Sequence, residues 1–486
     1  MLFSSQVFVL AFLPAALGGW CLLRRLDERL ALPFLIVASL VFYAWWRLEM
    51  VLLLAGSVAA NYGLGQRIRH LVLTGERESS RHWLAAGIAA NLLLLGWFKY
   101  ADFAARTLGL DPPGIALPLA ISFFTFQQIM FLAESGSDTR GNFGFLPYAA
   151  FVTFFPHLIA GPIVRPSEIV PQFAAAPSRR IDREALSSGL TLFLIGFGKK
   201  LVLADTFAAL ANPGFDAAAR GATVTLLEAW VALLAFALQI YFDFSGYSDM
   251  AIGLARMFGV RFPVNFNAPY QAASIAEFWH RWHITLSAFL RDYVYIPLGG
   301  NRRGPARQHV NLMATMLLGG LWHGAAWTFV AWGGLHGMYL VVHRLWSRHA
   351  PFALPRAVGW AVTLLAVLIA WVPFRASGAA ASWRMLRGMA GLDGIALPQF
   401  FVDALPVLAH VATPVPVLLN LGDARTLALP EALTCLLLGW AIVLLLPPVQ
   451  DWSERMRAWS LSGSFAFSAQ ALFFAPHMTP FLYFRF

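Results

Sequence analysis

Long stretches without charge recur along this 486-residue chain and constrain its fold more than any other feature. Charged residues make up 12% of the sequence, against roughly 25% in a soluble domain, and hydrophobic residues make up 59%. A length of 486 residues would otherwise suggest about three soluble domains. So few charges cannot cover the surface of such domains, so the sequence predicts an integral membrane protein. The same shortage excludes secreted, disordered and nucleic-acid-binding proteins.

The uncharged runs have the length of transmembrane helices, for which about 17–25 residues are needed. They are Phe3–Leu23, Leu30–Trp46, Val51–Gln66, Trp83–Phe98, Pro112–Ala133, Gly141–Val164, Leu186–Gly198, Ala229–Phe242, Gln308–His343, Ala357–Phe374 and Ala432–Gln450. Single-chain barrels need alternating strands, which the sequence lacks. We therefore expect an all-α polytopic membrane protein with roughly ten to twelve transmembrane helices, forming a single domain over residues 1–486.

The basic residues predict how the chain is oriented. Cytoplasmic loops collect Lys and Arg, which explains the net charge of +10 without a nucleic-acid partner. The segments expected to face the cytoplasm are Arg24–Arg29, Arg67–Arg81, Arg179–Arg183 and Arg302–Arg307. The basic cluster follows the first apolar run and no small-residue cleavage site precedes it. We therefore expect an uncleaved first span with its N-terminus outside.

Three segments should depart from simple crossings. An even number of crossings must separate two cytoplasmic loops, so Gly141–Val164, which contains Pro156, Gly161 and Pro162, is predicted to be a broken or re-entrant helix. Ala272–Gly300 carries too many charges to span simply and should enter from the cytoplasmic side. Gln308–His343 is long enough for two helices that turn near Gly324, which would place His323 at the periplasmic end of its helix.

Histidines within these apolar segments are the candidates for chemistry. His323 lies in an uncharged stretch bounded by glycines, where an imidazole with an ordinary pKa near 6.5 could accept a proton from a hydroxyl. A structural hydrogen bond to a neighbouring helix is the alternative. His280 and His283 are three positions apart and could share a helical face, but no third ligand follows at a suitable spacing, so no metal site is predicted.

Two further segments carry polar groups. Gly299 and Gly300 precede Asn301 and Arg302, an arrangement that could bind a phosphate, although positive-inside flanking alone would explain the arginine. The segment Tyr241–Asp249 contains two carboxylates at the end of an apolar run. One of them could orient a histidine, or both could pair with arginines, and the sequence does not separate these alternatives.

Taken together, these segments resemble the membrane-bound O-acyltransferase (MBOAT) family, in particular its bacterial branch containing alginate O-acetyltransferase. The similar stretches are FYAWWR (Phe42–Arg47), FFPHLIAGPIVRP (Phe154–Pro166), YFDFSGYSDMAIGL (Tyr241–Leu254), WHRWHITLSAFLRDYVYIPLGGNRRG (Trp279–Gly304) and LGGLWHGAAWTFVAWGGLHG (Leu318–Gly337). The resemblance implies helices arranged around a central tunnel and a catalytic core at about residues 115–343.

The resemblance also implies roles for individual residues. His323 matches the near-invariant histidine of the family, and His283, 40 residues earlier, matches its second polar position, so both are expected to be catalytic. Donor-binding or supporting roles are expected for Asn301, Arg302, Trp322, Asp243 and Ser245. Three departures stand out: His280 replaces a common arginine, residues 133–136 (Ala-Glu-Ser-Gly) replace a more usual aspartate-containing stretch, and Arg485 replaces a frequent glutamine.

The activity implied is transfer of an acetyl group from a cytoplasmic thioester, such as acetyl-CoA, to an exopolysaccharide such as alginate. No bound cofactor is expected, and a periplasmic acetyltransferase would be the partner of this multi-pass protein of the bacterial inner membrane. Peptidoglycan O-acetylation and D-alanylation of teichoic acids are the alternatives within the family. A transporter or a scaffold is the alternative of another class, although the paired broken helices of a transporter are not found in the sequence.

Overall fold

The computed structural model describes residues 1–137, 143–175, 182–350, 352–415, 429–452 and 481–482. Helices dominate these residues, and one short parallel pair joins β1 (Ala396–Pro398) to β2 (Thr413–Val415). The chain divides into two compact units. The first comprises the described residues of Met1–Phe197 and Tyr247–Val264, and the second those of Gly198–Gly246, Asn265–Ala471 and Pro476–Phe486. The prediction of a single domain over residues 1–486 stays a prediction.

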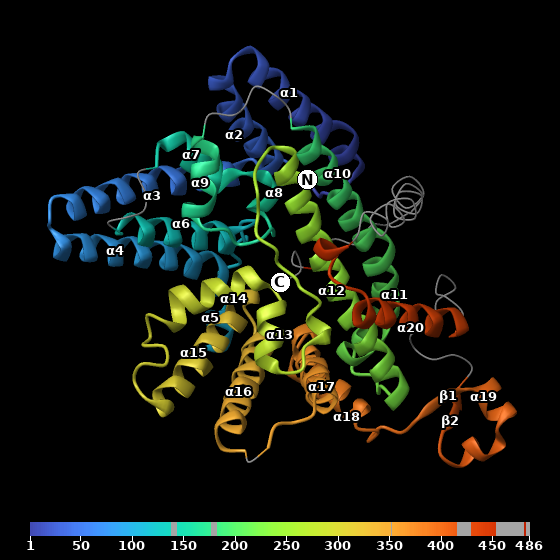
Figure 1. The fold of residues 1–486 in the computed structure, drawn as a ribbon. Helices are drawn as coiled ribbons and strands as arrows, with labels where there is room; N and C mark the ends of the chain where they lie inside the picture. The colour runs from blue at the N-terminus through green and yellow to red at the C-terminus, as the bar shows by residue number, and fades with distance from the viewer. Residues whose placement is uncertain (138–142, 176–181, 351, 416–428, 453–480, 483–486) are drawn as a thin grey trace. The chain divides into compact units, whose positions relative to one another are not determined.

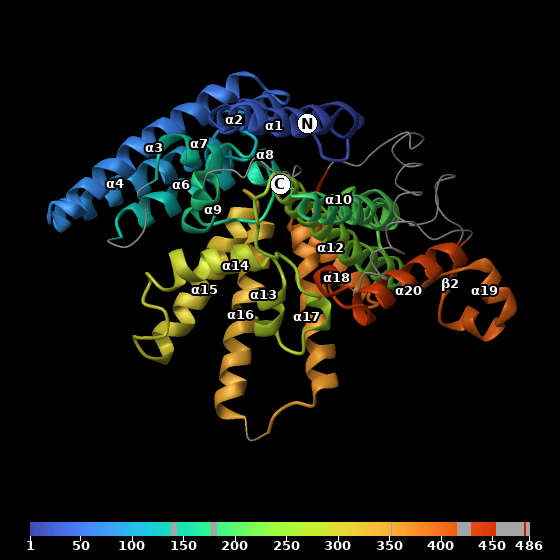
Figure 2. The same cartoon turned by 45° about the horizontal axis from the view of Figure 1, so that its top comes forward.

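The first unit is built from the N-terminal helices. They are α1 (Leu13–Leu26), α2 (Glu28–Ala44), α3 (Glu49–Leu73), α4 (Arg77–Leu95), α5 (Ala101–Thr107), α6 (Ile121–Ser135), α7 (Phe145–Thr153), α8 (Phe155–Leu158), α9 (Pro166–Ala174) and α10 (Arg183–Gly198). Figures 1 and 2 both show α3 and α4 lying side by side, and α6 packs against both. Glycines permit this close packing, because a Cβ at Gly65 would lie 2.4 Å from the Phe131 ring and one at Gly87 2.8 Å from Leu132.

The break predicted within Gly141–Val164 is confirmed, since Phe154 separates α7 from α8 with φ −52° and ψ 108°. Pro156 stands in the first turn of α8, where a missing backbone N–H costs nothing. The run Pro112–Ala133 was expected to be helical throughout, but α6 begins only at Ile121. Pro112, Pro113, Gly114 and Pro118 account for the difference, because they favour turns over helix.

The second unit contains the helices that carry the candidate catalytic residues. They are α11 (Asp205–Ala219), α13 (Ile275–Arg281), α14 (Ile284–Leu290), α15 (Pro305–His323), α16 (Trp327–His349), α17 (Arg356–Arg375), α18 (Ala379–Met389), α19 (Gln399–Ala404) and α20 (Leu429–Leu445). The long helix α12 (Leu226–Met257) contributes to both units. The predicted hairpin of Gln308–His343 is confirmed as α15 and α16 (Figure 1), with a turn that contains Gly324.

Five helical stretches of the described residues are long and apolar enough to cross a membrane. They are Phe8–Leu26, Arg77–Thr107, Arg183–Ala219, Leu226–Met257 and Arg356–Arg375. The helical, multi-pass character predicted from the sequence is therefore confirmed. The run predicted as Leu186–Gly198 is much longer in the structure, because a π-helical segment, Lys199–Ala204, joins α10 to α11 without an interruption.

Candidate active site

His323 is the last residue of α15 and is buried, with 5% of its surface exposed. The helix ends there because Gly324 is extended, with φ −162° and ψ 152°. A Cβ at Gly324 would lie 2.1 Å from the Phe329 ring, so only glycine lets the start of α16 approach this closely. The turn of the hairpin thus holds His323 among three aromatic rings. Their centroids lie 4.9 Å (Trp322), 4.9 Å (Trp332) and 5.3 Å (Phe374) from that of the imidazole.

His283 occupies the break between α13 and α14 and is fully buried. Its φ of 42° lies in the left-handed region, which is uncommon for a residue with a Cβ and often marks a functional position. The Nδ1 atom lies 3.2 Å from Oδ1 of Asn265. That oxygen also accepts hydrogen bonds from the backbone N–H (3.2 Å) and Oγ1 (2.9 Å) of Thr285, which identifies it as the acceptor.

This geometry fixes the tautomer of His283. Because Asn265 Oδ1 can only accept, the Nδ1 of His283 carries the hydrogen and Nε2 presents its lone pair. Among the described residues, this Nε2 atom is buried without a hydrogen-bond partner. His283 lies outside the five candidate spans, and burial lowers its pKa to about 3, so the imidazole is neutral near pH 7. A neutral imidazole with an open acceptor can take a hydrogen bond or a proton from a substrate.

Trp322 connects the two histidines. Its ring centroid lies 6.0 Å from that of His283 and 4.9 Å from that of His323. The structure therefore brings together three residues that the sequence analysis assigned to the site, although 40 positions separate the two histidines.

The expectation that His280 and His283 could share a helical face is wrong. Helix α13 ends at Arg281, and the left-handed conformation of His283 turns the chain away from the helical path. His280 is exposed whereas His283 is buried. Within the described parts of the chain, no group of three or more His, Cys, Asp or Glu side chains is arranged to hold a metal ion.

Asp243, one of the two carboxylates in Tyr241–Asp249, is buried on α12. Its Oδ1 lies 2.8 Å from Nζ of Lys200, and its Oδ2 accepts a hydrogen bond of 2.8 Å from the backbone N–H of Leu482. The partner is thus a lysine, which also lies 2.8 Å from Oδ1 of Asp205. This arrangement is a buried ion pair that fastens a C-terminal segment to α12.

Ser245 is also buried, and its Oγ has no hydrogen-bond partner among the residues that the structure describes. Phe244, between Asp243 and Ser245 in the sequence, packs edge-on against His283 with ring centroids 4.6 Å apart. These residues of α12 thus border the histidine through an aromatic ring.

The structure places Asn301 and Arg302 apart from the histidines. Both are exposed in the turn before α15, where Gly299, Gly300 and Gly304 adopt positive φ angles. His323 ends the same helix of 19 residues, which is about 28 Å long. The turn therefore lies at the opposite end of α15 from His323.

One histidine at this site was missed. His336 on α16 is fully buried, and neither ring nitrogen has a hydrogen-bond partner among the described residues. Its ring lies 4.8 Å from Trp332, which in turn contacts His323, and 5.1 Å from Trp279. The signal was present, since His336, like His323, directly precedes a glycine in an uncharged stretch. No local signal distinguishes Asn265 or Lys200.

Known proteins resemble most of this chain. Residues 66–381, which contain all the candidate site residues, match the membrane-bound O-acyltransferase (MBOAT) family. The chain is 40% identical over 447 residues to the peptidoglycan O-acetyltransferase of Helicobacter pylori, a match that covers 85% of this chain and 84% of that protein. It is 45% identical over 401 residues to the probable alginate O-acetylase AlgI of Pseudomonas aeruginosa, covering 80% and 75%. It is 30% identical over 239 residues to the teichoic acid D-alanyltransferase of Streptococcus thermophilus, covering 47% and 57%.

Proposed function

From the premise that this chain belongs to the membrane-bound O-acyltransferase family, we propose that it moves acetyl groups from a cytoplasmic thioester across the membrane for O-acetylation of a cell-surface polysaccharide. The observation that carries the proposal is the arrangement of His323 and His283 against Trp322. Both imidazoles are buried beside the Trp322 ring, where an imidazole could serve as the general base that O-acetylation needs.

In the proposed reaction, His323 accepts the proton of the acceptor hydroxyl while its oxygen attacks the carbonyl carbon of the thioester. The C–O bond forms, the C–S bond breaks, and the proton passes to the leaving thiolate. A positioned general base contributes about 10²–10⁴-fold to the rate. His323 could instead carry the acetyl group briefly as a covalent intermediate. In either case the aromatic rings around it exclude water, which would otherwise hydrolyse the thioester.

The remaining candidate residues would have supporting roles. The neutral His283 would accept a hydrogen bond at Nε2 from the donor or from the acceptor, and Trp322 would separate the two imidazoles. Asp243 and Ser245 would support the wall that Phe244 forms against His283. For acetyl-CoA, the phosphates would meet Asn301 and Arg302 at the cytoplasmic entrance, and the pantetheine arm would extend along α15 towards His323.

The proposed setting is the inner membrane of a bacterium. The protein would cross it with roughly ten to twelve spans, and broken helices would surround a central tunnel. Besides the five longer stretches, the spans would include the hairpin of α15 and α16 and the shorter apolar helix Ala432–Leu445. A periplasmic acetyltransferase would receive the acetyl group and pass it to the polymer. The bilayer itself is the other partner.

The relatives favour two acceptors. Five alginate O-acetylases are 41–45% identical to the chain, which favours an exopolysaccharide such as alginate. The peptidoglycan O-acetyltransferase is 40% identical over a longer stretch and makes peptidoglycan the second candidate. D-alanylation of teichoic acid is less favoured, because the two teichoic acid D-alanyltransferases are only 30% and 23% identical to the chain.

The test measures ester-linked acetate, released by mild alkali, on fractionated exopolysaccharide and peptidoglycan. Cells would carry the wild-type protein, His323→Ala, or the control His349→Ala, which removes an exposed histidine at the end of α16. We expect His323→Ala to remove acetate from one fraction at unchanged membrane abundance, and the control to keep it. Unchanged acetate in every fraction would overturn the proposal, and loss of D-alanine esters instead would redirect it to teichoic acid.

A further inference from the structure

A cavity of about 1200 Å³ lies within the first unit, whereas His283 and His323 belong to the second. Residues of six helices line it: the end of α1, the start of α2, the start of α7, α9, the start of α10 and the end of α12. Helices α10 and α12 are adjacent here, because a Cβ at Gly189 would lie 2.7 Å from the carbonyl oxygen of Gly253. A cavity of this size can hold a ligand larger than a single ion.

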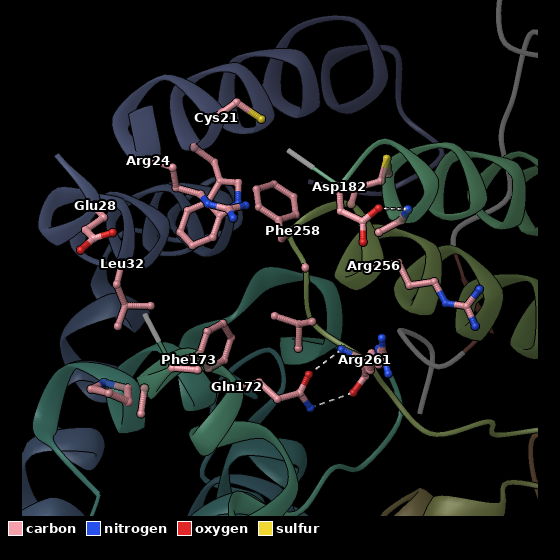
Figure 3. Close-up of a pocket in the computed structure, with 18 of the residues that line it drawn as sticks. Cys21, Arg24, Glu28, Leu32, Gln172, Phe173, Asp182, Arg256, Phe258 and Arg261 are labelled. Carbon is pink, nitrogen blue, oxygen red and sulfur yellow. Dashed lines mark hydrogen bonds between the residues drawn. The ribbon is translucent and has the colours of Figure 1, made fainter. Parts of the chain in front are cut away.

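Arginines stand on both sides of the cavity. Arg24 and Arg29 come from α1 and α2, and Arg256 and Arg261 from the end of α12 and the segment after it. Figure 3 shows the side chain of Arg24 on the wall formed by α1 and α2, across the cavity from Arg256 and Arg261. Guanidinium groups converging from two walls favour a phosphate, which accepts several charge-assisted hydrogen bonds.

The cavity also contains carboxylates, but each serves a helix start. Asp182 precedes α10 and accepts a hydrogen bond of 3.0 Å from the backbone N–H of Ala185. Glu184 and Glu28 lie in the first turns of α10 and α2, where the positive end of the helix dipole stabilises a negative charge. The cavity lining thus holds four arginines against three carboxylates, a net formal charge of +1.

Two phenylalanines, Phe173 and Phe258, line one side of the cavity and form its floor. Phe173 and Phe258 both pack edge-on against Phe154, with ring centroids 5.3 Å and 6.0 Å apart. Gln172 and Arg261 exchange two hydrogen bonds, of 3.2 Å and 2.8 Å, between the Gln172 amide and the Arg261 backbone. This floor can receive the apolar part of a ligand whose polar part meets the arginines.

The surroundings of the cavity place it at the level of lipid headgroups. The predicted cytoplasmic segment Arg24–Arg29 contributes Arg24, Glu28 and Arg29 to it, and the predicted segment Arg179–Arg183 contributes Asp182. Leu146, which lines the cavity, is 44% exposed, and on α1 the neighbouring Leu22 and Leu26 are 55% and 71% exposed. Exposed leucines beside arginines at a helix end are typical of the boundary between acyl chains and headgroups.

We infer that this cavity binds an anionic phospholipid of the cytoplasmic leaflet, with its phosphate between the arginines of α1–α2 and those at the end of α12, and the start of its acyl chains on the phenylalanine floor. The inference does not depend on the acceptor polymer proposed above. A lipid held here would join the α1–α2 pair to α9, α10 and the end of α12.

The test is native mass spectrometry of the full chain in delipidated detergent micelles, titrated with dioleoylphosphatidylglycerol. The variant combines Arg256→Gln with Arg261→Gln. The control combines Arg344→Gln with Arg348→Gln, which removes the same charge from an exposed helix end that does not line the cavity. We expect the cavity variant to weaken phosphatidylglycerol binding at least tenfold and the control to change it less than twofold. If the Arg256→Gln, Arg261→Gln variant does not fold, the single variant Arg29→Gln, which alters only an exposed side chain, is titrated in its place.

Two other ligands test whether the cavity prefers an anionic lipid over a zwitterionic lipid or coenzyme A. Dioleoylphosphatidylcholine should bind the wild-type protein at least tenfold more weakly than phosphatidylglycerol, because its choline group cancels the charge. Coenzyme A should not displace phosphatidylglycerol. Equal binding of both lipids, displacement by coenzyme A, or unchanged binding in the arginine variants would each overturn the inference. Coenzyme A displacement would identify the cavity as a donor site instead.

Discussion

The Oδ1 atom of Asn265 accepts from Nδ1 of His283 at 3.2 Å and thereby sets which nitrogen of a buried imidazole faces the site. The same oxygen accepts from the backbone and from the hydroxyl of Thr285. A single amide therefore orients the histidine and closes the break between α13 and α14.

Replacing Asn265 should separate this orientation from simple packing. Asn265→Leu leaves the Nδ1 hydrogen of His283 and two donors of Thr285 without an acceptor, so we expect a loss of stability of at least about 1–3 kcal/mol and of most acetyl transfer. Asn265→Asp keeps an acceptor in the same place and should retain more activity. The measurements are unfolding in mixed micelles and polymer-linked acetate. Equal activity in the two variants would contradict the orienting role.

Several parts of the fold were predictable because their signals are local. The hairpin of α15 and α16 follows from an uncharged run with glycines at its centre, and those glycines are what the close approach at Gly324 requires. The break at Phe154 follows from nearby proline and glycine. His323 and His283 were candidates because of their positions in the sequence, whereas their catalytic roles come from the resemblance and stay predictions until activity is measured.

Other parts depend on residues far apart in the chain. The sequence ended an apolar run at Gly198 because two lysines follow, but in the structure Lys200 is neutralised by Asp243, 43 positions later, so the helix continues. Local spacing also suggested that His280 and His283 share a helical face. The left-handed turn that prevents this is stabilised by Asn265, 18 positions earlier, which spacing does not reveal.

His336 should matter for activity more than for stability. Its nitrogens have no hydrogen-bond partner among the described residues, so His336→Phe should change the free energy of unfolding by less than about 1 kcal/mol, because no hydrogen bond is lost. We expect acetyl transfer to fall at least tenfold, since His336 contacts Trp332, which packs against His323. The acetate assay and unfolding in mixed micelles measure the two effects. A loss of 3 kcal/mol or more would show a structural role instead.

Because Lys200 and Asp243 form an ion pair, substitutions of the two residues should have non-additive effects on the free energy of unfolding. Lys200→Met leaves the Asp243 carboxylate buried and should cost about 3–5 kcal/mol of unfolding free energy. Adding Asp243→Asn removes that charge and should recover a large part of the loss, with an interaction energy of about 0.5–3 kcal/mol. Unfolding of the two single variants and the double variant completes the cycle. Additive effects would show that the two groups act independently.

The close approach of α15 and α16 at Gly320 should be needed to position His323. A Cβ at this position would lie 2.3 Å from the carbonyl oxygen of Phe329 and 3.1 Å from the Cα of Gly333, both backbone atoms that cannot turn aside. Gly320→Ala should therefore force α15 and α16 apart, move His323 relative to Trp332, and reduce polymer-linked acetate at least tenfold. Gly334→Ala on α16 is the matched control, because its Cβ would meet only the Leu317 side chain at 3.7 Å. If Gly320→Ala retained the acetate level of Gly334→Ala, the close approach of the two helices would not be what positions His323.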